Sequence, residues 1–271
     1  MSIGDLLRVE PGSRPDLDAI DPAGTPGWDG DKAAARDRLR ELRAELGDFQ
    51  ERLWAESSQS LLIVLQALDA GGKDGLIRKV ITAFNPQGTR VTGFGVPSDE
   101  ELRHDYLWRV HANAPGRGRI GVFNRSHYED VLVVRVNALV PEAVWRDRYD
   151  QINAWEAHLA ANGTRIVKLY LHISRDEQRD RFQKRLDNPE KHWKWSSGDL
   201  ETREKWVDFR AAYGDALARC STEAAPWFVI PADRKWYRDL AAAEILAEVA
   251  RQLDPQWPPA DEDLSAVVIP E

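Results

Sequence analysis

The sequence predicts an α/β protein in which a central parallel sheet of five strands lies between two layers of helices. Five short apolar runs alternate with longer segments of helical character along the 271 residues. Several of these runs are almost continuously apolar, which is typical of strands buried on both faces of a parallel sheet. A glycine-rich turn joins the first run to the helical segment after it. Strands and helices that alternate in this way form three layers with right-handed crossovers.

Length and composition favour one large domain without a membrane-spanning segment. A chain of 271 residues can form a single α/β domain with a full core. No apolar run approaches the ~18 residues of a membrane helix, and the N-terminus lacks the basic and apolar regions of a signal peptide. The only cysteine, Cys220, cannot form an internal disulfide. These features predict a cytoplasmic protein, and the net charge of −8 does not favour a nucleic-acid partner.

The two ends of the chain differ in composition from the middle. Residues 1–30 are rich in Pro, Gly and Asp without periodicity, which predicts an irregular arm that packs on the surface or is partly disordered. In residues 31–56 the apolar positions step by three and four, which predicts an amphipathic helix. This helix either docks on the domain or forms a dimer contact. Several prolines predict an irregular tail over residues 256–271, so a single domain is expected over residues 31–255.

The alternating elements follow this first helix. Strands are expected at residues 61–68, 89–96, 119–125, 165–173 and 227–231. Helices are expected at residues 76–84, 99–111, 140–161, 176–186, 200–219 and 237–253. In sheets of this type, ligands bind at the carboxyl ends of the strands. The residues directly after each expected strand are therefore the candidates for a functional site.

The turn after the first expected strand has the sequence Asp69-Ala70-Gly71-Gly72-Lys73-Asp74-Gly75. Glycines let backbone N–H groups surround phosphate oxygens, and a helix N-terminus adds positive potential. Lys73 is placed to reach a transferred phosphate, as in P-loop proteins. A glycine-rich turn with a solvated lysine is the alternative. Asp69 would repel a phosphate unless a cation intervenes, so we interpret it as a Mg²⁺ ligand or as the group that orients the attacking phosphate oxygen.

A polar string follows the third expected strand and reads Asn124-Arg125-Ser126-His127-Tyr128-Glu129-Asp130. Arg125 could neutralise the charge that spreads over the oxygens of a transferred phosphoryl group. Glu129 or Asp130 could provide a second metal contact, although acidic residues at a helix start also favour the helix dipole. His127 and Tyr128 are expected to pack or to contact substrate rather than to catalyse.

Basic residues concentrate after the fourth expected strand. Residues 179–194 carry six Lys or Arg against three Asp or Glu. Arg181 and Arg185 are four apart and share one helix face, with Lys184 beside them and Lys191 further along. The segment 175–198 is therefore either a solvated helix or a mobile basic lid that closes over phosphates and excludes water.

These motifs resemble the polyphosphate kinase 2 family. The resemblance covers roughly residues 30–255 and rests on the strings at 69–75 and 124–132, the basic segment 181–195 and residues 226–237. It implies a P-loop kinase fold similar to thymidylate kinase, with a helical lid, and it implies that the catalytic residues are Asp69, Lys73, Arg125 and Arg185. The residues expected to bind phosphate or substrate are Ala70, Gly71, Gly72, Asp74, Gly75, Asn124, Arg181, Lys184 and Lys191, and those expected to bind metal are Asp69, Glu129 and Asp130.

The resemblance also implies an activity. This activity is reversible phosphoryl transfer between inorganic polyphosphate and a nucleoside mono- or diphosphate, with AMP or ADP expected first and guanine nucleotides second. Mg²⁺ is the expected cofactor, with Mn²⁺ as a substitute, and a homodimer or homotetramer is the expected assembly. Asn124 with Glu129 and Asp130 resembles the subgroup that uses both monophosphates and diphosphates. Two other functions stay open, an ATP-dependent nucleoside monophosphate or small-molecule kinase on the same fold and a nucleotide-binding protein without catalysis.

Overall fold

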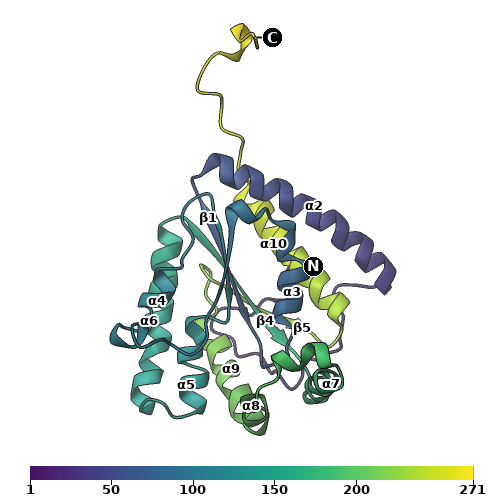
Figure 1. The fold of residues 1–271 in the computed structure, drawn as a ribbon, viewed down its shortest axis with the longest axis vertical. Coiled ribbons are helices and arrows are strands. Elements are labelled where there is room, and N and C mark those ends of the chain that lie inside the picture. Colours follow the sequence, from purple (N-terminus) through teal and green to yellow (C-terminus); the bar gives the residue numbers. More distant parts are fainter. Residues whose placement is uncertain (271) are drawn as a thin grey trace.

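Five parallel strands form the centre of the molecule in the order β2-β3-β1-β4-β5 (Figure 1). The computed structural model describes residues 1–270. The strands are β1 (Ser60–Gln66), β2 (Thr89–Gly93), β3 (Ile120–Asn124), β4 (Thr164–His172) and β5 (Trp227–Pro231). Because β1 pairs with β3 on one side and β4 on the other, the carboxyl ends of these three strands meet at one edge of the sheet. The predicted five-stranded parallel sheet is confirmed.

Helices cover both faces of the sheet (Figure 1). One face is covered by α2 (Lys32–Glu56), α3 (Lys73–Lys79) and α10 (Lys235–Leu253), and the other by α4 (Trp108–His111), α5 (Val133–Val136), α6 (Glu142–Ala161) and α9 (Trp206–Cys220). Alternate residues of β1 reach the two cores. Leu61 and Ile63 pack with the first group of helices, and Leu62 and Val64 with the second. The strand is buried throughout for this reason, as its continuous apolar run predicted.

The long helix α2 docks on the domain and runs beside α10 (Figure 1). Its residues Leu42, Leu46 and Phe49 are buried in the core on this face. Arg38 adds an ion pair, with its Nε 2.8 Å from Oε1 of Glu244 on α10. The apolar stripe of residues 31–56 is therefore used within the chain, which is the first of the two interpretations that the sequence left open.

The first part of the N-terminal arm is ordered, so the prediction of an irregular segment over residues 1–30 is wrong there. Residues Ile3–Leu7 form the helix α1, which begins with a capping box. The N–H of Val9 donates to the carbonyl oxygen of Trp227 at 2.9 Å, so the arm continues along the edge strand β5. Ile3, Leu7 and Val9 are buried. Three apolar residues are too few to give a periodic signal in the sequence, yet they cover an otherwise exposed sheet edge.

Several predicted helices are interrupted in the structure. Residues 99–111 form the 3₁₀ turn η3 (Glu101–Arg103) and then α4. Between them the Asp105 carboxylate accepts a hydrogen bond from the N–H of Leu107 at 2.9 Å, and such a local bond competes with a continuous helix. Residues 200–219 divide into α8 (Gly198–Glu204) and α9. The predicted lid contains α7 (Arg175–Leu186) and the 3₁₀ helix η5 (Pro189–Lys194).

Short 3₁₀ turns complete the structure. Within the expected helix 76–84, α3 is followed by the 3₁₀ turn η1 (Ile81–Ala83). The other turns are η2 (Pro86–Gly88), η4 (His127–Asp130) and η6 (Leu264–Ala266).

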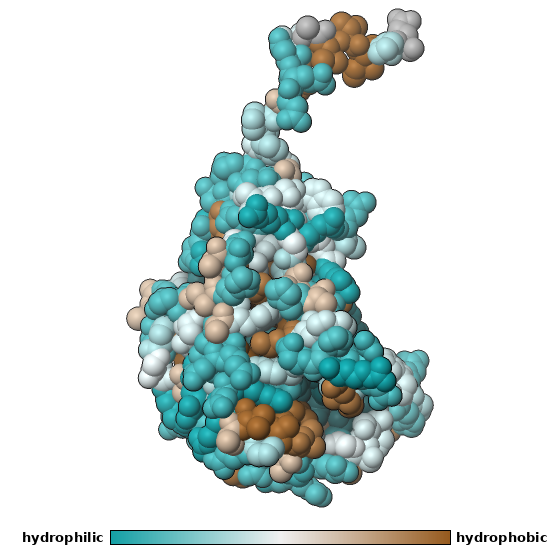
Figure 2. All heavy atoms as spheres, turned by 90° about the vertical axis from the view of Figure 1, so that its left-hand side faces the viewer, coloured by the Kyte–Doolittle hydropathy of each residue, from teal (hydrophilic) through white to brown (hydrophobic). Residues whose placement is uncertain are grey.

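Exposed apolar side chains gather at two places on the surface. The chain beyond α10 extends away from the body and contains η6, and Val268 and Ile269 near its end are exposed (Figures 1 and 2). On the body, Leu139 and Val207 are exposed beside α5, α6 and α9. A hollow of about 760 Å³ lies there, between the segment from Arg135 to Trp145 and α9. None of the helices in the described part of the chain is long and apolar enough to span a membrane.

Candidate active site

The glycine-rich loop, residues 67–72, leaves β1 at the carboxyl edge of the sheet and enters α3. Ala70 and Gly72 have positive φ angles of 60° and 107°. A Cβ atom added to Gly71 would lie 2.5 Å from the Cβ of Ala67, so the turn has no room for a side chain at this position. Ala70 holds a left-handed conformation that costs an L-residue about 1–2 kcal/mol. Strain of this kind is found where a loop must present its backbone in one particular shape.

Three side chains from distant segments hold the carbonyl groups of the glycine-rich loop. Gln178, Arg181 and Arg238 donate hydrogen bonds of 2.9, 2.9 and 3.2 Å to the backbone carbonyls of residues 69, 70 and 72, respectively. Among the described residues, no side chain caps the N-terminus of α3, where the loop enters the helix. With the carbonyls engaged from outside, the N–H groups at this N-terminus are the polar groups that can receive an anion.

The structure corrects the role predicted for Arg181. Its side chain is buried, its Nε donates to Oε1 of Glu177 at 2.7 Å, and its Nη2 donates to the carbonyl oxygen of Ala232 at 2.5 Å. Since its donors are engaged, Arg181 positions the glycine-rich loop and presents no free guanidinium to a phosphate. Gln178 and Arg238 also position the glycine-rich loop. Neither was expected from the sequence, because no motif links them to a loop more than a hundred residues away.

Lys73 is the first residue of α3 and its side chain turns back under the loop. The Nζ atom donates to the carbonyl oxygen of Ala67 at 2.9 Å and is almost fully buried. Burial lowers the pKa of Lys73, and the positive charge of Arg125 lowers it further. The carboxylates of Asp69, Glu129 and Asp74 oppose this change without cancelling it. The folded protein therefore disfavours the positive charge of this ammonium group. A bound phosphate oxygen would compensate that charge.

Arg125 reaches the same place from the neighbouring strand β3. Its N–H donates to the carbonyl oxygen of Leu65 at 3.1 Å, which ties the turn to β1, and its φ of 63° is left-handed. The Nη2 atom lies 2.6 Å from Oδ1 of Asp69. Burial by itself would lower the pKa of Arg125, but Glu129 and Asp69 outweigh burial and raise it. The structure thus brings Asp69, Lys73 and Arg125 together, because β1 and β3, the strands that they follow, pair with each other.

The two acidic residues after Arg125 separate in the structure. Glu129 faces the site, where burial raises its pKa while Arg125 and Lys73 oppose the increase. Asp130 instead pairs with Arg148 on α6, at 3.0 Å between Oδ1 and Nη1. Burial raises the pKa of Asp130 to about 6. Its pairing with α6 favours Glu129 over Asp130 as the second metal contact, for which the sequence offered both residues.

The remaining carboxylates fit a magnesium ion that is shared with a substrate. Within residues 1–270, no group of three or more His, Cys, Asp or Glu side chains is arranged to hold a metal by itself. Mg²⁺ is commonly held through one or two carboxylates together with substrate phosphates. Asp69 and Glu129 lie near enough to each other that the charge of Asp69 raises the pKa of Glu129. The two carboxylates can therefore provide such oxygen ligands together. The donor set therefore suits a hard cation that arrives with phosphates.

Asp74, in the first turn of α3 directly after the glycine-rich loop, contacts the lid. Its Oδ2 lies 3.2 Å from Nζ of Lys194 in η5, and its Oδ1 accepts a hydrogen bond of 3.1 Å from Asn124. Burial by itself raises the pKa of Asp74, but the hydrogen bonds from Lys194 and Asn124 more than offset it, so the pKa is lowered. Asp74 and Asn124 are thus part of a contact that brings the lid against the loop. Lys194 is a site residue that was not expected from the sequence.

The lid arginine Arg185 also lies beside the site. Its Nη1 is 3.0 Å from Oδ2 of Asp199 on α8. Burial raises the pKa of Asp199 and the charge of Asp69 raises it further, while Arg185 and Arg125 oppose the increase. The Arg185–Asp199 pair therefore lies close enough to Asp69 and Arg125 to interact with their charges. The two predicted lid lysines, Lys184 and Lys191, are exposed. Their roles in substrate binding stay predictions.

The fold and the site together define a phosphotransferase of the P-loop kinase type. A parallel sheet carries a glycine-rich loop, a lysine begins the next helix, and an arginine from the adjacent strand meets an aspartate of the loop. The chain belongs to the polyphosphate kinase 2 family, whose family model matches residues 29–257.

Relatives of known name agree with this assignment along nearly the whole chain. The AMP/ADP-polyphosphate phosphotransferase of Meiothermus ruber is 51% identical over 262 residues, which are 97% of this chain and 98% of that protein. The ADP-polyphosphate phosphotransferase of Rhodopseudomonas palustris is 47% identical and covers 81% of this chain and 80% of its own. The crystal structure of polyphosphate kinase 2 from Arthrobacter aurescens superposes with a TM-score of 0.94 at 44% identity, covering 98% of this chain and 95% of that one.

Proposed function

We propose that this protein transfers a phosphoryl group between inorganic polyphosphate and an adenine mono- or diphosphate, forming ADP, ATP or both in a reversible reaction. The observation that carries the proposal is the meeting of Asp69, Lys73 and Arg125 at the carboxyl edge of the sheet, with Arg125 Nη2 at 2.6 Å from Asp69 Oδ1. The names of the relatives at 51% and 47% identity support the two substrates.

The chain contributes mainly charge and position to this reaction. Phosphoryl transfer needs little covalent chemistry from a protein, because the barrier falls when donor and acceptor are aligned and the developing charge is neutralised. Lys73 and Arg125 approach from two adjacent strands and supply that charge from fixed positions. The lid, which contacts the loop through Lys194 and Asp74, excludes water that would otherwise accept the phosphoryl group.

We propose Mg²⁺ as the cofactor, with Mn²⁺ able to substitute. Asp69 and Glu129 would hold it on the protein side, and the bound ion would neutralise phosphate charge. A cytoplasmic location and a homodimer or homotetramer also belong to the proposal. The exposed Leu139, which lines the hollow beside α9, and the exposed Val207 on α9 support an association surface, because exposed apolar patches commonly mark contacts.

The test is a polyphosphate-driven assay with separated nucleotide products. The protein is incubated with Mg²⁺ and polyphosphate, without ATP, and offered AMP, ADP, GMP or GDP in separate reactions. We expect new ADP or ATP from the adenine nucleotides and a smaller yield from the guanine nucleotides. Formation of a nucleoside diphosphate only when ATP is supplied would favour an ATP-dependent kinase, and nucleotide binding without turnover with either donor would favour a binding protein.

A further inference from the structure

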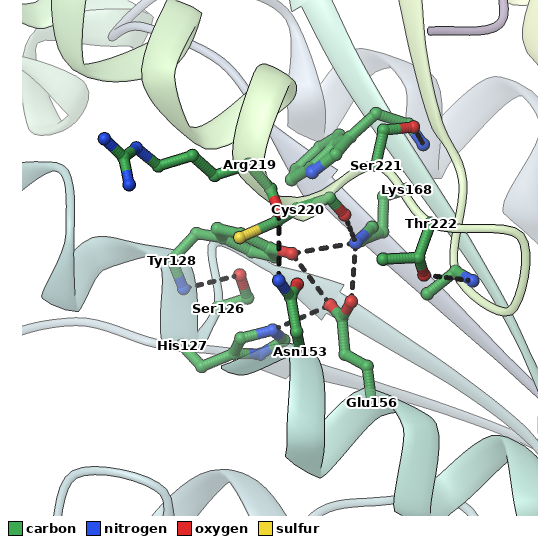
Figure 3. Close-up of polar contacts among 12 residues, drawn as sticks. Ser126, His127, Tyr128, Asn153, Glu156, Lys168, Arg219, Cys220, Ser221 and Thr222 are labelled. Atoms are coloured by element: carbon green, nitrogen blue, oxygen red, sulfur yellow. Dashed lines mark hydrogen bonds and ion pairs between the residues drawn. The ribbon is translucent and has the colours of Figure 1, made fainter. Parts of the chain in front are cut away.

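A fully buried ion pair lies behind the turn that carries Arg125 and Glu129. Lys168 of β4 and Glu156 of α6 are both buried, with Nζ 2.5 Å from Oε2 (Figure 3). Lys168 also donates to the carbonyl oxygen of Cys220 at 2.5 Å and to the hydroxyl of Tyr128 at 2.8 Å. None of these atoms belongs to the glycine-rich loop or to the lid.

The carboxylate of Glu156 binds two side chains of the turn, those of His127 and Tyr128. His127 Nε2 lies 3.1 Å from Oε1, and the Tyr128 hydroxyl donates to the same oxygen at 2.9 Å (Figure 3). Both residues are fully buried and directly precede Glu129. The turn also binds β1, because Ser126 Oγ accepts hydrogen bonds from Gln66 Nε2 at 3.1 Å and from its own turn. The front of the turn faces the site while its back is fastened to the core.

The hydrogen-bond geometry makes this attachment specific, because one oxygen, Oε1 of Glu156, binds both His127 and Tyr128. Burial by itself raises the pKa of Glu156, but Lys168 and His127 outweigh burial and lower it, which keeps the carboxylate charged. A charged carboxylate only accepts, so Nε2 of His127 carries the proton. The other ring nitrogen, Nδ1, is buried without a partner among the described residues.

Stability alone does not explain such a network. Taking two charges out of water is so costly that well-packed apolar residues in their place are often as stable or more stable. The turn, in contrast, needs restraint, because Arg125 has a left-handed φ of 63° and its guanidinium must meet Asp69 across two strands. Directional bonds from a buried carboxylate fix orientation in a way that apolar packing does not.

We infer that Glu156 and Lys168 are positioning residues for phosphoryl transfer, which act through His127 and Tyr128 to hold Arg125 and Glu129 in place. The inference rests on the proposed function of the site that Arg125 serves. Neither residue touches substrate, so their contribution appears only in steps that need the turn in its native orientation.

The main test replaces the pair by apolar residues of similar size, Glu156→Leu with Lys168→Met. We expect kcat to fall on the order of 10²-fold, because misplacement of about 1 Å can cost this much. The KM for polyphosphate should change much less, since Arg125 acts mainly on the transition state. The melting temperature should fall, because His127, Tyr128 and the carbonyl group of Cys220 lose buried hydrogen-bond partners, so activity is compared at a temperature at which the variant is folded. A folded paired variant with kcat near the wild-type value overturns the inference.

A cycle with Arg125→Ala separates positioning from a general structural effect. If the pair acts through Arg125, the paired replacement should cost little further activity in the Arg125→Ala background. Losses that multiply in full would overturn the inference. The matched control is Thr164→Val, which removes a buried hydrogen bond of 3.0 Å between Thr164 and Ser60. Thr164 begins β4, at the end of the strand opposite to the edge that carries the site, so kcat should stay unchanged.

Tyr128→Phe decides the matter if the paired variant does not fold. It keeps the ring and the ion pair and removes only the hydroxyl that binds Glu156. A several-fold lower kcat in a folded Tyr128→Phe protein supports the inference, and an unchanged kcat overturns it. A wild-type protein that is inactive with polyphosphate would refute the proposed function instead, and the same variants would then be compared with ATP as the donor.

Discussion

Replacing Lys73 with methionine should abolish most activity while making the ligand-free protein more stable. The ammonium group is almost fully buried, and within residues 1–270 its one hydrogen bond is to the carbonyl oxygen of Ala67 at 2.9 Å. Burial and Arg125 lower its pKa, which means that the folded protein disfavours the charge. Methionine fills similar volume without a charge. The destabilising interaction is removed together with the group that would contact a phosphate.

The size of the loss follows from the role of the charge. Removing one preorganised stabiliser of a developing charge costs about 10²–10³ in kcat, or about 2.7–4 kcal/mol. The stability change has a sign that can be derived from linkage. Because the pKa of Lys73 is lower in the folded protein, the unfolded chain binds more protons between the two pKa values, and wild-type stability rises with pH there. The Lys73→Met protein should lack this rise and be the more stable of the two at neutral pH.

Two measurements check this prediction, initial rates of polyphosphate-driven ADP or ATP formation and urea unfolding at neutral pH. Lys79→Met is the matched control, since Lys79 ends the same helix and is exposed. This control should keep near-normal activity. Near-normal kcat in Lys73→Met would refute the assignment of the glycine-rich loop as the phosphate site.

Three further changes test other parts of the structure. Asp69→Asn removes a carboxylate and the ion pair with Arg125, so the Mg²⁺ concentration for half-maximal activity should rise by about tenfold or more. Lys194→Met breaks the lid contact with Asp74, which should raise the KM for polyphosphate about 3–10-fold with a smaller effect on kcat. His172 is buried and burial lowers its pKa to about 4, so the unfolded chain binds more protons below pH ~6.5 and stability should fall by about 3 kcal/mol as pH drops from ~6.5 to ~4. His172→Gln should flatten this decrease in urea unfolding.

Each of these predictions has a result that contradicts it. An unchanged Mg²⁺ dependence in Asp69→Asn would remove Asp69 from the proposed metal site. Equal KM values for Lys194→Met and the wild type would show that the contact with Asp74 does not help to hold the lid over polyphosphate. If His172→Gln and the exposed control His158→Gln have the same pH dependence as the wild type, another group causes the acid sensitivity.

The sequence predicted the sheet and the meeting of the central residues because both depend on local patterns. Apolar runs such as that of β1 are buried on both faces, and the carboxyl ends of parallel strands converge. The pairing of β1 with β3 then places Arg125 beside Asp69. The order of the strands and the pairing of the arm with β5 depend on contacts between distant residues, which leave no trace in a single sequence.

The sequence could not distinguish arginines that bind substrate from arginines that support the loop. Arg181 and Arg185 share a helix face and a basic neighbourhood, yet Arg181 turns inward to the carbonyl of Ala70 while Arg185 pairs with Asp199. The difference arises from the orientation of α7 on the sheet. The separation of Glu129 from Asp130 also depends on how an element is oriented. The 3₁₀ turn η4 directs one carboxylate to the site and the other to Arg148.

The charges of the assembled site explain why carboxylates belong in a place that must attract phosphates. Three basic side chains meet three acidic ones there, and these are Lys73, Arg125, Lys194, Asp69, Asp74 and Glu129. With all six ionised, their formal charges cancel, so the protein groups provide little net attraction for a polyanion. Under the proposed function, a divalent cation at the carboxylates would restore a positive centre and would leave the arginine and lysine donors to face phosphate oxygens. The Mg²⁺ titration of Asp69→Asn therefore tests the charge balance of the whole site, since loss of one carboxylate should weaken metal binding while it makes the metal-free site more attractive to polyphosphate.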